Sequence, residues 1–191
     1  GDRRATLGEM VTSVYGPGEG QVVAFGEFRQ ERDRSHTLGG KIMFWEIIFV
    51  AAEVEVDEET GCYAVRKLAT AADVGRAINP LSVEGQDEGG ALMSVGQAMM
   101  EQFLLDERGI PRNLGALDYR IPTVLDIPDQ VRSLLIENAD GPGPFGCKGV
   151  GESGAIAVAP AVGAAVSAAT GVRFRDLPIT AERVWLALRD A

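Results

Sequence analysis

Charged and apolar positions alternate in one part of the chain, which indicates a strand. Residues 53–57 follow the period-two pattern of a strand that buries one face. A turn comes next, and its last residue, Gly61, is free to adopt a positive φ. Two extended runs joined by a short, glycine-ended loop predict a β-hairpin with strands near 42–56 and 62–74.

Three helices are predicted from apolar spacing and composition. The helix near 83–103 has apolar residues three and four positions apart, together with several glycines that each cost about 1 kcal/mol in an ordinary helix. These glycines indicate close packing, either against a sheet or against a cofactor. A small-residue helix is predicted near 152–169 with Gly171 as its C-cap, and a last helix near 180–190 with Thr180 as its N-cap.

Two further runs complete the pattern. Residues 131–137 predict a third strand, and residues 21–28 have the composition of another strand. Together these elements predict an α+β fold in which helices pack on mixed sheets. Residues 1–50 are weakly patterned, so we expect an N-terminal segment over 1–50 and a C-terminal subdomain over 51–191.

Composition excludes several classes of function. A formal net charge of −10 argues against nucleic acid as a partner, because such binding needs a concentrated basic face. One histidine and two cysteines in the whole chain argue against a zinc site, a disulfide framework or an iron–sulfur cluster. No run of about 18 apolar residues is present, so we expect no membrane-spanning helix. The chain begins without methionine and without a signal-peptide core, which leaves a fragment, a processed subunit and a trimmed protein open.

The glycine-rich stretch GPFGCKGVGESG, residues 143–154, is the strongest candidate site. It does not fit a phosphate-binding P-loop, because Cys147 stands where that motif needs lysine, and Lys148 is followed by glycine. It does not fit a dinucleotide fingerprint either. Glu152 stands immediately before the predicted helix. Spacing alone leaves it either as a capping glutamate in a surface turn or as a catalytic carboxylate.

This stretch and several others, in order, resemble one enzyme family. GPFGCKGVGE resembles the active-site loop of the molybdenum subunits of xanthine dehydrogenase, aldehyde oxidase and carbon monoxide dehydrogenase. The other similar stretches are 53–61, 72–90, 118–128 and the C-terminal segment beginning VAPAVGAA. The resemblance covers about residues 50–187 and implies the C-terminal portion of a molybdopterin-binding domain.

Roles for individual residues follow from the resemblance alone. It implies that Glu152 is the general base beside the molybdenum, and that no side chain ligates the metal directly. Met93 stands where many members have a glutamine that reaches the pterin. The positions implied to lie along the cofactor are Gln86, Met93, Lys148, Gly149, Val150 and Gly151.

The resemblance also implies the reaction and the partners. The reaction is hydroxylation of an aldehyde or N-heteroaromatic compound at a molybdopterin (Mo-pyranopterin) centre, with the cytosine dinucleotide form of the cofactor left open. Electrons would pass to 2Fe-2S and FAD groups on an iron–sulfur subunit and an FAD subunit, in a cytoplasmic hetero-oligomer that includes the remainder of the molybdenum subunit. This chain alone would then be inactive. The alternative is a structural or assembly subunit that keeps the fold without the chemistry.

Overall fold

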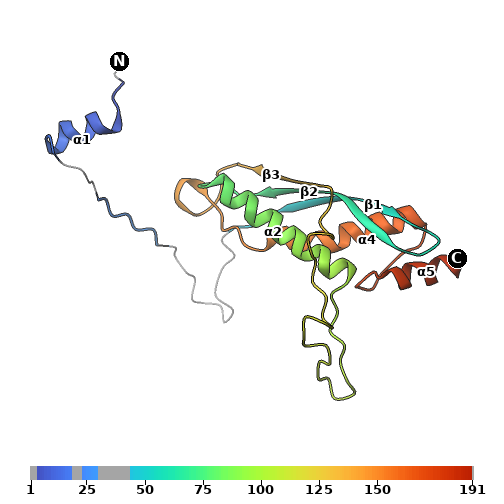
Figure 1. The fold of residues 1–191 in the computed structure, drawn as a ribbon. Helices are drawn as coiled ribbons and strands as arrows, with labels where there is room; N and C mark the ends of the chain where they lie inside the picture. Colours follow the sequence, from blue (N-terminus) through green and yellow to red (C-terminus); the bar gives the residue numbers. More distant parts are fainter. Residues whose placement is uncertain (1–3, 19–22, 30–43, 191) are drawn as a thin grey trace. The chain divides into compact units, whose positions relative to one another are not determined.

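The computed structural model describes residues 4–18, 23–29 and 44–190. Contacts divide the chain into two units, residues 1–31 and 32–191. Figure 1 shows the helices and strands, most of them labelled.

The N-terminal unit contains one helix that the sequence did not predict. Helix α1 (Leu7–Tyr15) begins at a capping box, in which the Thr6 hydroxyl accepts from the Glu9 N–H and the Glu9 carboxylate accepts from the Thr6 N–H. The predicted strand at 21–28 is wrong where it can be compared: residues 23–28 form no strand, and residues 21–22 lie outside the described residues. A strand needs a partner, and none is available to 23–28 within the described part of this unit.

The second unit is built on a three-stranded sheet. Strand β1 (Ile48–Val56) pairs antiparallel with β2 (Tyr63–Asp73), and β2 pairs parallel with β3 (Gln130–Ile136). The predicted hairpin and third strand are therefore confirmed, although β1 starts later than the predicted 42. Residues 44–47 are irregular, and 42–43 lie outside the described residues.

Helices α2 (Pro80–Met99) and α4 (Val158–Thr170) cover one face of the sheet (Figure 1). The core there joins buried Leu68 of β2 with aliphatic residues of both helices, including Val95 and Val162. The opposite face has an apolar row across all three strands, formed by Phe49, Ala71 and Leu134 in register. Phe49 is 67% exposed and Leu134 is 60% exposed. We call this row the outer apolar row.

Helix α2 differs from its predicted bounds at both ends. It starts at Pro80, because the Asn79 side chain caps it by accepting from the Ser82 N–H at 3.3 Å. It ends at Met99, because the N–H groups of the next two residues both turn back to the Gly96 carbonyl. Phe103, the last apolar position of the predicted pattern, lies beyond the helix and is 61% exposed.

The predicted helix at 152–169 is divided into α3 (Ser153–Ile156) and α4. Pro160 has no N–H to donate to the Ile156 carbonyl, so the helical ladder breaks at Ala157. The stretch 153–170 is long and apolar enough to cross a membrane by length and composition alone, but a core helix of a globular domain passes the same test. Here Val162 and its neighbours on α4 pack in the core.

Helix α5 (Ala181–Arg189) begins as predicted. The Thr180 hydroxyl accepts from the Arg183 N–H at 3.3 Å and so caps the helix. Two contacts hold the start of this helix to the hairpin. The Tyr63 hydroxyl donates to the Ile179 carbonyl at 2.8 Å, and Gly61 packs against the α5 backbone with a φ of +73°.

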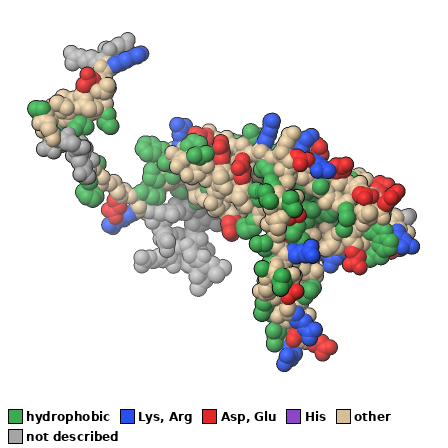
Figure 2. Space-filling view, in the orientation of Figure 1, with side chains coloured by type: hydrophobic (Ala, Val, Ile, Leu, Met, Phe, Trp, Pro, Cys, Tyr) green, Lys and Arg blue, Asp and Glu red, His purple; other side chains and the backbone are tan. Residues whose placement is uncertain are grey.

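Between α2 and β3 the chain makes a long excursion, residues 101–129, which we call the arm (Figure 1). The buried Asn113 side chain ties its base by accepting from the Leu104 N–H at 2.9 Å and donating to the Gln102 carbonyl at 2.6 Å. Within the arm, one isolated bridge pairs Leu105 with Pro111. Figure 2 shows apolar side chains along the arm, where Leu117 is 94% exposed.

The glycine loop is fixed to the end of β2 by a buried ammonium group. Lys148 Nζ lies 2.8 Å from Asp73 Oδ2, 2.9 Å from Asp140 Oδ1 and 3.0 Å from the Trp45 carbonyl oxygen. The hydrogen bonds that Lys148 donates to the Asp140 and Asp73 carboxylates raise the pKa of Lys148. Burial opposes ionisation of Asp73, but its hydrogen bonds from Lys148, the Gly75 N–H and Asn138 outweigh burial and lower its pKa. We call this group the Lys148 anchor.

Replacing Gly61 with alanine should destabilise the second unit strongly. The new Cβ would lie 2.2 Å from the Ala181 carbonyl oxygen, at a positive φ that alanine disfavours. We expect the free energy of unfolding in urea to fall by roughly 2–5 kcal/mol. Gly109→Ala is the matched control, since Gly109 has a φ of +76° with open space around it and should lose only about 1–2 kcal/mol. Equal losses in both variants would contradict the packing role of Gly61.

Lys148→Met should remove the charge that the Lys148 anchor depends on. Leaving Asp73 unpaired should lower the free energy of unfolding by about 3 kcal/mol near neutral pH. Lys67→Met, which removes an exposed pair with Glu53, should cost under about 1 kcal/mol.

The loss in Lys148→Met should also depend on pH in a set direction. The lysine's raised pKa makes its contribution disappear as pH rises beyond 10.5, and the lowered aspartate pKa makes its contribution disappear as pH falls below 3.8. The difference from wild type should therefore be constant between these limits and shrink outside them. A difference that grows as pH falls below 3.8 would be inconsistent with the Lys148 anchor.

Candidate functional site

The glycine loop lies along one face of α2. Gln86, Met93 and Gln97 are seven and four residues apart, so they share a helix face. Gln86 Nε2 donates to the Gly151 carbonyl at 2.9 Å. One turn further along α2, Gly90 lies against Gly154. The face of α2 thus holds the second half of the loop from one side while the Lys148 anchor holds the first half.

The glycines of α2 differ in what lies next to them. Gly90 packs on the loop, and a Cβ at Gly96 would lie 2.4 Å from Pro122 of the arm. These two positions need glycine for contact within the chain. Gly85 and Gly89 have no other described atom within 4 Å of the place that a Cβ would take, so packing within the described chain does not explain them.

The loop offers backbone donors that the described chain does not use. The N–H groups of Gly149, Val150, Gly151 and Glu152 donate no hydrogen bond to another described residue. At Gly151 the space that a side chain would fill is open, and at Gly149 the nearest atom is the Phe44 ring at 3.6 Å. Consecutive free N–H groups with clearance fit an acceptor-rich group, such as the phosphate or the ring oxygens of a pterin cofactor.

Glu152 lines a cavity of about 640 Å³ beside these donors. It occupies the N-cap position of α3, yet its side chain makes no capping hydrogen bond. Its carboxylate is exposed, with no ion pair to any residue in the described part of the chain. A capping glutamate would accept a hydrogen bond from an N–H in the first turn of the helix. Glu152 accepts none there, so the structure does not support the capping alternative. The remaining residues of the cavity wall are Glu46, Gln97, Gly151, Ser153, Ala155 and Ile156.

A second cavity, of about 340 Å³, adjoins the first half of the loop. Gln86, Lys148 and Val150 line it together with residues at the start of α2. Lys148 was predicted to lie along a cofactor, but its ammonium group is engaged in the Lys148 anchor, and its side chain is 4% exposed. Met93 is 47% exposed on α2 and lines neither cavity. Cofactor contact by these two residues stays a prediction.

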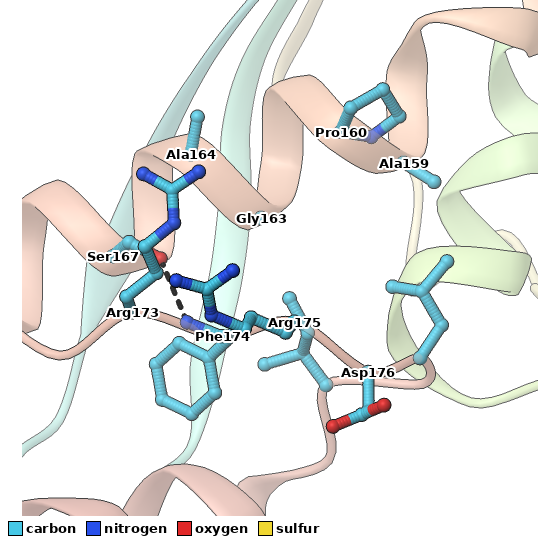
Figure 3. Close-up of a pocket in the computed structure, with 11 residues that line it drawn as sticks. Ala159, Pro160, Gly163, Ala164, Ser167, Arg173, Phe174, Arg175 and Asp176 are labelled. Atoms are coloured by element: carbon cyan, nitrogen blue, oxygen red, sulfur yellow. Dashed lines mark hydrogen bonds between the residues drawn. The ribbon is translucent and has the colours of Figure 1, made fainter.

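A separate cavity, of about 440 Å³, lies between α4 and residues 173–179 (Figure 3). The Ser167 hydroxyl there accepts from the Phe174 N–H at 3.2 Å, which ties the segment to α4. The guanidinium groups of Arg173 and Arg175 lie at its edge in Figure 3. This cavity includes none of the predicted site residues.

Sequence reasoning missed two carboxylates beside the loop. Asp87 of α2 is 1% exposed and accepts hydrogen bonds from the Thr70 and Ser133 hydroxyls through Oδ2. Gly154 packs so closely on Asp87 that a Cβ there would lie 2.8 Å from Oδ1. Asp87 thus ties α2 to β2 and β3 below the loop.

The other missed carboxylate is Glu46, which faces the same cavity as Glu152. Its Oε1 atom is buried and has no hydrogen-bond partner among the described residues. The only signal in the sequence was one charge inside an apolar run, IMFWEIIFVAA.

Sequence comparisons identify relatives of the chain. The family described as "Molybdopterin cofactor-binding domain" matches residues 2–128. The gamma subunit of the 6-hydroxypseudooxynicotine dehydrogenase complex of Paenarthrobacter nicotinovorans is 37% identical over 136 residues, which are 70% of this chain and 17% of that protein. The aldehyde oxidoreductase molybdenum-binding subunit PaoC of Escherichia coli (strain K12) is 34% identical over 191 residues, which are 100% of this chain and 25% of that protein.

Solved structures give the same result. Aldehyde oxidoreductase from Desulfovibrio gigas matches 79% of this chain and 16% of its own with a TM-score of 0.71 at 32% identity. Quinoline 2-oxidoreductase from Pseudomonas putida 86 matches 72% of this chain and 18% of its own with a TM-score of 0.64 at 37% identity. The predicted α+β class is confirmed by these neighbours.

The chain spans a quarter or less of the length of these relatives. The matches in sequence and structure show that the chain belongs to the molybdopterin cofactor-binding domain family, as part of a molybdenum-binding subunit of the xanthine dehydrogenase and aldehyde oxidoreductase type.

Proposed function

We propose that this chain forms one wall of the active site of a molybdenum hydroxylase, which oxidises an aldehyde or N-heteroaromatic substrate with Glu152 as general base. One observation carries the proposal: a carboxylate that no described residue pairs with lines a cavity of about 640 Å³, next to a run of backbone N–H groups that no described residue accepts from. The relatives named above are molybdenum-binding subunits and oxidoreductases, which supports the reaction class.

Each part of the loop then has a task. The N–H groups of Gly149, Val150 and Gly151 donate to oxygen acceptors of the cofactor. Gln86 holds the Gly151 carbonyl and so keeps that peptide in place. When bound, the molybdenum–pterin group supplies the two-electron oxidation of the substrate. The Glu152 carboxylate accepts the proton that is released as the oxygen–carbon bond forms, and it needs no rearrangement because no other group of the described chain holds it.

The opposite wall and the path for electrons come from elsewhere. The cavity is open, and the outer apolar row and the arm leave large apolar side chains exposed. Exposed apolar surface of this extent is typical of a protein interface. We assign these surfaces to the remainder of the molybdenum subunit, in a hetero-oligomer in which iron–sulfur and FAD subunits carry the electrons onward. The cytosine dinucleotide form of the cofactor, the cytoplasmic location and a boundary near residue 50 stay predictions.

Glu152→Gln should lower turnover of the assembled enzyme by about 10²–10⁴-fold, because the amide cannot accept the proton. Molybdenum content, measured by mass spectrometry, should not change, since the carboxylate does not hold the metal. Glu59→Gln, in the exposed turn of the hairpin, is the matched control and should keep wild-type turnover. Wild-type turnover in Glu152→Gln would refute its role as general base.

Molybdenum should be present when the chain is purified from the full assembly and absent when the chain is purified alone. The N–H groups of residues 149–152 would hold the cofactor from this chain, and the other contacts needed to retain it would come from the remainder of the molybdenum subunit. A full assembly without molybdenum would overturn the enzymatic proposal and favour a structural or assembly subunit.

A further inference from the structure

We propose that Glu46 is a second carboxyl group of the Glu152 cavity and that it selects uncharged, hydrogen-bond-accepting ligands over carboxylates. This inference rests on the proposed function only in treating the cavity as the place where substrate binds. It concerns which ligands enter, and no proton transfer in the reaction depends on it.

The position of Glu46 is unusual for a glutamate. It stands two residues before β1, between Trp45 and Ile47, and its side chain turns back to line the cavity with Glu152 and Gln97. Its Oε1 atom is buried without a hydrogen-bond partner in the described residues. A buried polar atom that lacks a partner is costly. Because Glu46 lines the cavity, a ligand there would meet its carboxyl group.

Groups from every neighbouring element act on this carboxyl group. Burial is the largest influence and raises the pKa of Glu46, and the negative charges of Asp87 on α2 and Asp73 on β2 raise it further. The neighbouring Ser153 side chain and the positive charge of Lys148 act in the opposite direction without cancelling the rise in the pKa of Glu46. The carboxyl group therefore keeps its proton to a higher pH than an exposed glutamate does.

The two protonation states of Glu46 act differently, and the ionised state is the one that disfavours a carboxylate ligand relative to a neutral one. The protonated group donates a hydrogen bond to a carbonyl oxygen or a ring nitrogen. The ionised group adds a second negative charge to that of Glu152 and repels an anionic ligand. Like charges several ångströms apart at a protein surface change affinity on the order of tenfold or more. Selection against carboxylates should therefore strengthen as pH rises through the pKa of Glu46.

The first test measures the burial of the carboxyl group in the full chain, without cofactor or activity. Because the folded-state pKa is raised, Glu46 contributes stability below its ordinary value of 4.5 that is lost as pH rises through the folded value. The urea midpoint of Glu46→Gln should therefore rise relative to wild type between pH 5 and pH 9. Glu84→Gln, at an exposed position on α2, should stay parallel to wild type. Parallel curves for Glu46→Gln and wild type would overturn the proposal.

The second test measures binding in the assembled enzyme by calorimetry, with benzamide as the neutral probe and benzoate as the carboxylate of the same shape. Wild type should prefer benzamide by about tenfold or more at pH 8, and the preference should grow from pH 5 to pH 9. In Glu46→Gln the preference should shrink and lose its pH dependence, while Glu84→Gln keeps the wild-type ratio. An unchanged ratio in Glu46→Gln would overturn the proposal. Turnover is not needed, so this result is independent of the role of Glu152.

Discussion

The buried Lys148 ammonium is the interaction on which the geometry of the site depends. Its three oxygen partners come from the residues before β1, the end of β2 and Asp140, just before the glycine loop. The ammonium group is shielded from water. Without it, the Asp73 carboxylate would lose its cationic partner. The same contact places Glu46 near the loop, since Trp45 supplies the third oxygen. One cation thus positions both carboxylates of the cavity, although it forms no ion pair with Glu46 or Glu152 among the described residues.

A second constraint acts between α2 and the sheet. Asp87 joins α2 to β2 and β3 through two hydroxyl groups, and Gly154 fits against it only because glycine has no side chain. Helix α2 cannot shift along the sheet without breaking these bonds. Gln86, one residue earlier, then meets the Gly151 carbonyl in a fixed place. The first half of the loop is closed by its own backbone hydrogen bonds, such as that from the Gly143 N–H to the Cys147 carbonyl, and the second half is held by the elements on either side of it.

How far the sequence predicts this structure depends on whether a feature is local. The hairpin, the Thr180 cap and the Gly171 C-cap are local signals, and the structure has them. Phe103 continued the apolar spacing of a helix, but the hydrogen bonds that close α2 at Gly96 cannot be read from spacing. The break before Pro160 was within reach of sequence reasoning.

The same distinction between local and distant features holds for the candidate site. The motif around Glu152 could be identified from the sequence, because residue order carries it. The engagement of Lys148 could not, because its partner Asp73 is 75 residues away. Glu46 could not be identified either: one charge in an apolar run gives no information on which side chain it will face.

The parallel pairing of β2 with β3 has a consequence for how the protein is made. Strand β2 is complete at Asp73, but its neighbour starts at Gln130, and Lys148 comes later still. The ribosome adds roughly 5–20 residues per second. Several seconds therefore pass between the synthesis of the hairpin and that of β3 and Lys148, which complete its edge. During that interval its apolar residues are open to other nascent chains. Contacts of such long sequence separation slow folding, so the unfinished edge of the hairpin is a site at which aggregation can begin during synthesis.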